Sequence, residues 1–293
     1  MKHLFTCLLG VGLGLPAAAQ KTSPKPAAKP APGPAFTLAC PVVPASASLQ
    51  KQHCETRALT LPAPPAGTPL TVDARLHGSI LVRAWSGPDV RVRAVVTGRA
   101  ATPAAAKALA AAVRVSSQNN VLQAARANES LDGWEVSYEV LVPAQTDLTL
   151  RSTNGSISVE NVRGTLRCES TNGSLALTGV GGDVRGKTTA GSLTLTLTGS
   201  AWQGPGLDVS TVNGSIAWQL PAVYAATIMA RTVQGRVQAE LNTKRKSVLP
   251  HNLVATLGKG GAQLRATTVN GSVTVKQEAL PLDVQLTEEE GSK

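Results

Sequence analysis

One short turn sequence recurs six times in the second half of this chain. Each copy is an Asn-Gly pair or a variant of it, followed by a polar residue and then an apolar one. The first three turn glycines are 18 residues apart, and the later three follow at wider gaps. Such self-similarity predicts a repeat architecture in which one supersecondary unit has been copied. The residues to which we assign these turns are Asn154, Gly155, Asn172, Gly173, Gly191, Asn213, Gly214, Gly235, Asn270 and Gly271.

The residues on either side of each turn alternate as they do in a strand with one buried face. After the first turn the apolar Ile157 and Val159 flank Ser158, and the later copies keep both apolar positions. A narrower column, with small members such as Cys168 and Gly186, lies four residues before the Asn-type position. Each unit is therefore predicted to run strand, corner, strand, corner. A further apolar column, six residues before that position, contains Leu148, Leu166, Val184, Leu207, Ile228 and Leu264.

The corners have the residues that tight turns use. Asn tolerates a positive φ and Gly adopts one at no steric cost, so we interpret the Asn residues as turn formers and not as ligand-binding residues. A Ser or Thr two positions before each Asn-type residue could form a local hydrogen bond or stack on its equivalents in neighbouring units. Ala190 and Gln234 replace Asn in two copies, which would interrupt a ladder of stacked Asn side chains.

Two architectures fit these columns: a β-solenoid whose coils stack, and a long meander of hairpins with the same apolar face. Periodicity does not separate them. We favour the solenoid because equivalent positions keep similar sizes, as coils that sit directly on one another require. The predicted fold class is all-β, a β-solenoid of two-strand units with Asn-Gly turns. Thr102 and Pro103 predict one short flanking α-helix over Ala104–Val113, with strands at 113–115 and 134–142.

Three sequence features together resemble a known bacterial family. They are the repeated Thr-Asn-Gly-Ser-Ile, the Gly-Gly-Asp-Val-Arg-Gly stretch at 181–186, and the Gly-Ser-Ile-Leu-Val-Arg-Ala-Trp stretch at 78–85. The chain resembles the "putative adhesin" β-strand-repeat domain, a domain of unknown function, over about residues 68–277. The resemblance implies an exported, envelope-associated and non-enzymatic β-solenoid, and the family offers no catalytic residues to carry over.

The two ends of the chain predict that the protein is exported and that a signal peptide, a linker and a tail flank its folded domain. A charged start, an apolar stretch from Leu4 to Leu15 and small residues before Gln20 are typical of a signal peptide. No later run approaches the roughly 20 apolar residues of a membrane span. We therefore expect a periplasmic, cell-surface or extracellular protein. The predicted organisation is a signal peptide at 1–19, a Pro/Ala/Lys-rich linker at 20–67, the β-strand-repeat domain at 68–277 and a flexible tail at 278–293.

Three cysteines remain after the predicted signal peptide. Cys40 and Cys54 are close in sequence and could form a disulfide in an oxidising compartment. Cys168 stands in the narrow apolar column, so we interpret it as a buried, inert thiol and not as a nucleophile.

Composition argues against several kinds of site. The net charge of +10 favours acidic partners, but aromatic residues make up only 3% of the chain, which argues against a nucleic-acid module. We interpret the basic run Lys244-Arg245-Lys246 as a solvated loop between coils, in preference to an anion-binding site. The histidines are far apart, and the outward positions of the repeats are expected to be mostly Ser, Thr, Ala and Gln. We therefore predict no catalytic residue, no cofactor and no metal site.

These observations favour an exported, non-catalytic β-repeat protein that is an adhesin-like module or envelope scaffold. Its expected partner is an envelope glycan or a protein that the sequence does not identify. One alternative is an envelope-stress or signalling accessory that binds a protein partner. Another is a polysaccharide-active β-helix enzyme, although fold-level analogy alone is weak grounds for an activity.

Overall fold

The computed structural model describes residues 34–41, 50–127 and 132–280. The chain divides into two compact units, Met1–Ala31 and Pro32–Lys293, and all described residues belong to the second. The predicted signal peptide lies outside the described residues, as do the start of the predicted linker and most of the predicted tail.

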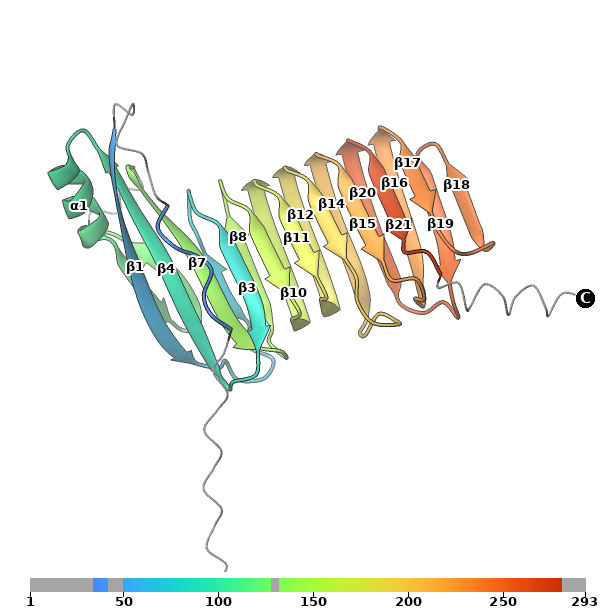
Figure 1. Ribbon diagram of the computed structural model, residues 1–293, viewed down its shortest axis with the longest axis horizontal. Coiled ribbons are helices and arrows are strands. Elements are labelled where there is room, and N and C mark those ends of the chain that lie inside the picture. Colours follow the sequence, from blue (N-terminus) through green and yellow to red (C-terminus); the bar gives the residue numbers. More distant parts are fainter. Residues whose placement is uncertain (1–33, 42–49, 128–131, 281–293) are drawn as a thin grey trace, which may run out of the picture. The chain divides into compact units, whose positions relative to one another are not determined.

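Within the described residues the chain forms 21 strands and one helix, arranged in two sheets (Figure 1). We call the 10-stranded sheet sheet A and the 11-stranded sheet sheet B. The elements are β1 (Lys51–Pro62), β2 (Leu70–Asp73), β3 (Ile80–Trp85), β4 (Asp89–Ala100), α1 (Pro103–Ala112), β5 (Arg114–Gln118), β6 (Val121–Ala125), β7 (Trp134–Pro143), β8 (Leu148–Ser152), β9 (Ile157–Glu160), β10 (Arg163–Asn172), β11 (Leu175–Thr178), β12 (Gly181–Ala190), β13 (Leu193–Thr196), β14 (Gly206–Asn213), β15 (Ile216–Leu220), β16 (Ala226–Gln234), β17 (Val237–Glu240), β18 (Lys246–Leu249), β19 (Asn252–Leu257), β20 (Gln263–Asn270) and β21 (Val273–Gln277).

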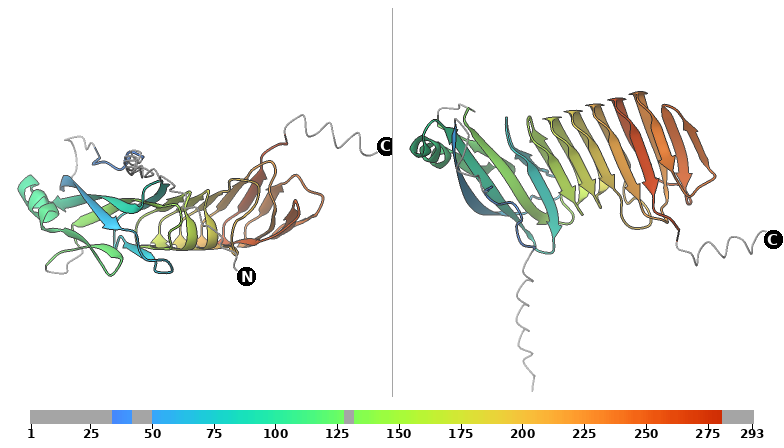
Figure 2. Two further views of the ribbon diagram at one scale, coloured as in Figure 1. Left: turned by 90° about the horizontal axis from the view of Figure 1, so that it is seen from below. Right: turned by 45° about the horizontal axis from the view of Figure 1, so that its top comes forward.

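From β8 to β17 successive strands alternate between the two sheets. In sheet B, β8, β10, β12 and β14 pair in parallel, and in sheet A, β9, β11, β13 and β15 do the same (Figures 1 and 2). Each repeat is therefore one coil of a solenoid and not a hairpin, because a hairpin would pair its two strands antiparallel. The all-β, solenoid-like repeat with one helix that the sequence predicts is confirmed.

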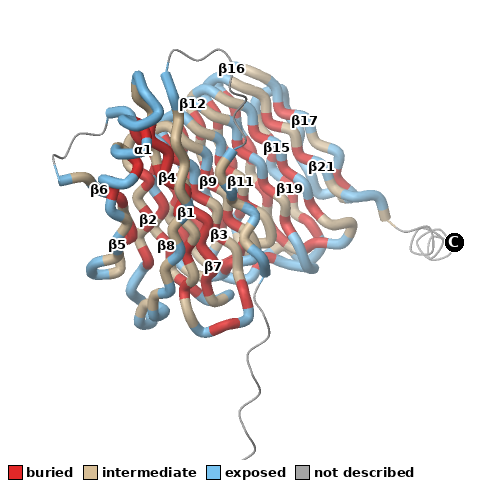
Figure 3. Tube along the Cα trace, turned by 60° about the vertical axis from the view of Figure 1, so that its left-hand side comes forward, coloured by how far each residue is buried: buried red, intermediate tan, exposed pale blue. Residues whose placement is uncertain are grey.

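The register is set by the apolar columns. Leu166 on β10 pairs with Leu148 on one side and Val184 on the other, and Leu175 on β11 pairs with Ile157 and Leu193 in the same way. All of these residues are fully buried. Burial alternates along the coil strands β8 to β16, as Figure 3 shows for part of the stack. Each buried Leu, Ile or Val contributes about 1.5–3 kcal/mol relative to exposure, so a one-residue slip between coils would be costly.

Four of the six turn glycines are needed for close packing between coils and not for their backbone angles. Gly155, Gly173 and Gly191 lie outside the left-handed region, so the positive-φ explanation is wrong for them. A Cβ at Gly173 would lie 2.1 Å from the carbonyl oxygen of Gly155, and one at Gly191 would lie 2.2 Å from that of Gly173. Gly235 and Gly271, with φ of +141° and +158°, differ from them in their backbone. Any side chain at these corners would therefore push neighbouring coils apart.

A column of buried hydroxyls fixes the same corner. Ser170 Oγ donates to the carbonyl of Gly155 over 3.0 Å, and Thr188 Oγ1 donates to that of Gly173 over 2.8 Å. Each bond joins one coil to the next, so it is not the local hydrogen bond that the sequence suggests. The hydroxyls that bond to a neighbouring turn glycine in this way belong to Ser152, Ser170, Thr188, Thr211, Thr232 and Thr268.

The turn Asn side chains form two short ladders on the exposed side of the corner. Asn172 Nδ2 donates to Asn154 Oδ1 over 2.8 Å, and Asn270 Nδ2 donates to Asn213 Oδ1 over 2.7 Å. Ala190 stands between β10 and β14 at the equivalent position and has no amide to continue the ladder. These Asn residues bond to one another from coil to coil.

The last coils do not stack in chain order. β20 pairs in parallel with both β14 and β16, and β21 pairs in parallel with both β15 and β17 (Figure 1). The coil formed by β20 and β21 therefore lies between two coils that both precede it in the sequence. β19 and β18 then extend sheet B by antiparallel pairing beyond β16.

The amino-terminal end of the solenoid is covered by longer strands and by α1. β1 and β4 pair antiparallel, β4 pairs antiparallel with β7, and α1 packs on β4 and β1. Thr102 caps the helix by accepting a hydrogen bond from the amide of Ala105 over 3.2 Å. Residues 51–62, which the sequence interpretation placed in the linker, form β1 and belong to sheet A.

Residues 34–41, which we call the strap, lie over β3, β7 and β4. The amides of Thr37 and Leu38 donate to the carboxylate of Glu139 over 2.7 and 2.6 Å. Glu139 is fully buried and also pairs with Arg83. A disulfide joins Cys40 of the strap to Cys54 of β1. The strap therefore covers the outer side of sheet A where Glu139 would otherwise face water.

Candidate functional site

The two outer faces of the solenoid carry different residues. Between β9 and β15 the outward positions of sheet A are mostly small and uncharged, as at Ser158, Ala176, Thr194 and Ala217. Charged residues are the largest group at the outward positions of sheet B, beside hydroxyl residues such as Thr171 and Ser210. The expectation of Ser, Thr, Ala and Gln therefore holds for sheet A and is wrong for sheet B. We call the outer side of sheet B from β2 to β16 the charged face; it carries Asp73, Arg151, Arg167, Glu169, Asp183, Arg185, Lys187, Asp208, Arg231 and Arg265.

The 18-residue repeat aligns these charges in rows that cross the strands. Glu169 pairs in register with Arg151 on one side and Lys187 on the other, and Arg167 pairs with Arg185. Both rows alternate with buried residues, so their side chains point to solvent. The same 18-residue spacing is visible in the sequence and could have located this part of the face.

One carboxylate of the charged face is held by two guanidinium groups. Arg167 Nη2 lies 2.6 Å from Asp183 Oδ2, and Arg185 Nε lies 3.6 Å from Asp183 Oδ1. The hydrogen bond from Arg167 lowers the pKa of Asp183, and Arg185 adds to this effect although partial burial opposes it. Asp183 is therefore ionised at neutral pH and neutralises part of the positive charge around it.

A second pair on the face is weaker. Arg151 Nε lies 3.8 Å from Glu169 Oε2, and their side chains are 60% and 64% exposed. Water and salt screen such a pair, which contributes at most about 1 kcal/mol. Both groups therefore remain available to other partners.

Three cations of the charged face have no side-chain partner among the described residues. Lys187, Arg231 and Arg265 are exposed and form neither a hydrogen bond nor an ion pair through their side chains there. Lys187 lies on β12, Arg265 on β20 and Arg231 on β16, so the swapped order of the last coils places the two arginines on adjacent strands. The cations are free to bind an anion.

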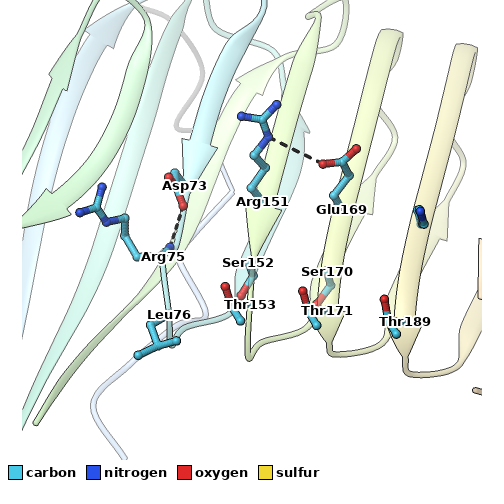
Figure 4. A pocket seen from close by; sticks show the side chains of 11 residues that line it. Asp73, Arg75, Leu76, Arg151, Ser152, Thr153, Glu169, Ser170, Thr171 and Thr189 are labelled. Atoms are coloured by element: carbon cyan, nitrogen blue, oxygen red, sulfur yellow. Dashed lines mark hydrogen bonds and ion pairs between the residues drawn. The ribbon is translucent and has the colours of Figure 1, made fainter. Parts of the chain in front are cut away.

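The charged face is hollowed along its length. The first hollow, of about 560 Å³, crosses β2, β8, β10 and β12 and is lined by Asp73, Arg151, Glu169 and Lys187. Figure 4 shows Thr153, Thr171 and Thr189 in a row at its margin, one from each of three neighbouring coils.

Two further hollows continue the line. One, of about 360 Å³, is lined by Arg185, Asp208 and Arg265, and the next, of about 250 Å³, by Arg265, Arg231 and Val254. Because the first two hollows both reach β12 and the last two share Arg265, they follow one another across the strands of sheet B.

The residues assigned to the turns lie at the corner beside this face. None of the ten described Asn and Gly turn residues lines the three hollows. Their contacts hold neighbouring coils together, as shown above for Gly173 and Asn172.

Cys168 does not offer a nucleophile. It is fully buried between coils, and burial raises the pKa of its thiol to about 12. Since the thiolate is the reactive form, this sulfur is inert near neutral pH.

The described residues include no group of three His, Cys, Asp or Glu side chains that could hold a metal ion. No helix in the described part of the chain is both long and apolar enough to cross a bilayer.

Comparison with known proteins identifies a family and a set of similar structures. The family model of Toastrack DUF4097 matches residues 78–276. No curated protein matches the chain. One similar solved structure is a "putative cell adhesion protein" from Clostridium sporogenes ATCC 15579, with 12% identity and a TM-score of 0.41, over 78% of this chain and 100% of that one. Another is a "putative adhesin" from Bacteroides fragilis NCTC 9343, with 11% identity and a TM-score of 0.39, over 77% of this chain and 97% of that one.

Proposed function

The chain belongs to the Toastrack DUF4097 family, and on that premise we propose that it is an exported, non-catalytic binding or scaffold module of the cell envelope. The observation that carries this proposal is the charged face, with its row of hollows and its three unpaired cations. The signal-peptide pattern at residues 1–19 supports export, because an apolar stretch of that length behind a charged start is typical of secreted precursors.

Binding accounts for the charged face better than catalysis does. The lowered pKa of Asp183 makes it a poor proton donor at neutral pH, and the hydrogen bond from Arg167 occupies one of its oxygens. The other charges lie on a broad and exposed surface, where electrostatic stabilisation of a transition state is weakened by water. Such a surface suits a large ligand that covers it.

The experiment that tests this function is co-sedimentation of the purified protein with bacterial envelope fractions over a series of salt concentrations. We expect saturable binding that weakens gradually as salt rises, since exposed charges are screened beyond about 8 Å at 0.15 M. Absence of saturable binding at any salt concentration would contradict the proposal. Release of reducing ends from envelope glycans would instead favour a polysaccharide-active enzyme.

A further inference from the structure

We propose that the charged face binds an extended acidic polysaccharide that lies across the strands from β12 to β16, with its anionic groups on Lys187, Arg265 and Arg231. This inference rests on the proposed binding function and specifies the chemistry of its ligand. It begins from the three cations that have no partner among the described residues.

The spacing of these cations suits a polymer. Lys187 on β12 is in register with Ser210, Thr267 and finally Arg231 on β16. Since neighbouring strands lie about 4.8 Å apart, the two cations at the ends of this row are separated by about 14 Å. Arg265 lies between them on β20, one row away. No single small anion spans that distance, whereas a chain that carries several anionic groups does.

The groups between the cations suit a sugar chain. Ser210 and Thr267 occupy the two middle positions of the row and present hydroxyls that can donate or accept hydrogen bonds. Asp208, between Arg185 and Arg265, is the acidic residue on β14 and reduces the positive potential there. The charged face has six basic and four acidic residues, so its net charge is positive. Asp183 is already paired with Arg167 and Arg185.

Other polyanions fit this face less well. Single-stranded nucleic acid is normally held by aromatic side chains on which its bases stack, and no aromatic residue lines the three hollows. An anionic bilayer would favour large apolar side chains that insert between headgroups, whereas charged Asp183, Arg185 and Asp208 line the hollow between β12 and β20. Met229 and Val254 line the last hollow beside Arg231, so the test below includes anionic vesicles. The line of hollows and unpaired cations across these strands matches an extended chain of acidic sugars.

The test uses polygalacturonate, a carboxylated polysaccharide, as the probe and measures its affinity for the purified protein at physiological salt. The variant combines Lys187→Gln, Arg231→Gln and Arg265→Gln. The matched control removes three charges elsewhere, by Lys244→Gln, Arg245→Gln and Lys246→Gln in the exposed basic run. We expect about tenfold weaker binding for the first variant and a change of less than about twofold for the control, because an exposed ion pair contributes up to fivefold in affinity. All six residues are exposed, so we expect little change in melting temperature for either variant. The control also loses the hydrogen bonds that Arg245 and Lys246 donate to the carbonyls of Gly258 and Leu241, so its melting temperature is measured beside that of the first variant.

Four comparisons define what would overturn the inference. Equal weakening by the two variants would show that only net charge matters. Equal binding of monomeric galacturonate and the polymer at the same carboxylate concentration would exclude an extended site. Binding to phosphatidylglycerol vesicles without binding to polygalacturonate would assign the face to a membrane. If the protein sediments with envelope fractions but does not bind polygalacturonate, this inference fails and the proposed binding function stands.

Discussion

At the scale of single residues, neighbouring coils meet where glycine faces glycine. The stack from Gly78 through Gly155 and Gly173 to Gly191 leaves no room for a Cβ, because one at Gly155, Gly173 or Gly191 would lie 1.9–2.2 Å from the carbonyl oxygen of the glycine before it. The hydroxyl of Ser170 or Thr188 then bonds to that same carbonyl. Glycine and hydroxyl therefore work together: one lets the backbones approach, and the other satisfies the oxygen that the approach buries.

We expect Gly173→Ala to destabilise the protein by about 2–3 kcal/mol, since the new methyl group must displace backbone and not a flexible side chain. The matched control is Gly67→Ala, where φ is +78° and nothing lies within 4 Å of the added Cβ. Backbone strain alone should cost about 1 kcal/mol there. Urea denaturation measures both free energies of unfolding. Equal losses would show that the contact between coils is not what requires glycine at 173.

Removal of a single corner hydroxyl should have a smaller effect. Thr188→Val keeps the shape of the side chain but leaves the carbonyl of Gly173 without its hydroxyl donor, so we expect a loss of about 1 kcal/mol. Thr194→Val, on the exposed face of sheet A, replaces the same residue type in the same solenoid and should change stability by less than about 0.5 kcal/mol. Thermal unfolding compares the two variants. A loss at Thr194 as large as that at Thr188 would contradict a specific role for the hydroxyl column.

At the scale of elements, the strap depends on one buried carboxylate. Glu139 accepts the amides of Thr37 and Leu38 and pairs with Arg83, whose side chain is only 17% exposed. Breaking a buried pair leaves an uncompensated charge, so we expect Glu139→Gln to cost about 3 kcal/mol and to loosen the strap. Glu135→Gln is the control, because its pair with Arg99 is partly exposed and contributes about 1 kcal/mol or less.

Denaturation and limited proteolysis together test this prediction. Faster cleavage within residues 34–41 of the Glu139 variant, with the Glu135 variant unchanged, is the expected result. Equal cleavage rates in both variants would mean that the disulfide between Cys40 and Cys54, with the contacts of Arg83 and Arg93, holds the strap without Glu139.

The elements differ in how far their sequences predict them. The coil strands and α1 can be predicted from local sequence patterns. The alternation of buried and exposed residues marks each coil strand, and the Thr102 cap marks the start of α1. β1 cannot be predicted in this way. It pairs along one edge only, and most of its residues are half-buried or exposed, so its sequence lacks the apolar alternation of a buried strand.

The charged face is also predictable from the sequence only in part. The 18-residue spacing predicts the row of Arg151, Glu169 and Lys187, whereas Arg231 and Arg265 become neighbours only through the swapped order of the last coils.

At the scale of the whole described unit, the stack is a series of nearly interchangeable coils. Each coil presents equivalent apolar columns to both sides, and this equivalence lets β20 and β21 insert between coils that precede them. Different ends terminate the series: α1 and the long strands at one, and the exposed edge strand β18 at the other. The basic run that begins at Lys244 leads into that edge, where its charge opposes pairing with other strands.

If the coils are interchangeable, we expect that one whole coil can be deleted without preventing the rest of the domain from folding. Removal of residues 164–181 would join Arg163 to Gly182, which occupies the position equivalent to Gly164, so that every following residue keeps its column. In a stack that gains its stability from neighbouring interfaces, we expect this variant to fold with one cooperative transition at a lower urea concentration. Its m-value should fall as well, because less surface is exposed on unfolding.

The control deletes half a coil, residues 164–172, and removes β10 while keeping β11. Every later strand would then meet the wrong sheet, so we expect this variant to lack a cooperative transition although it loses fewer residues. Circular dichroism with urea titration distinguishes the two variants. If both fold equally well, register is not set by the columns; if neither folds, the coils are not interchangeable, and stability depends on contacts particular to the coil of β10 and β11.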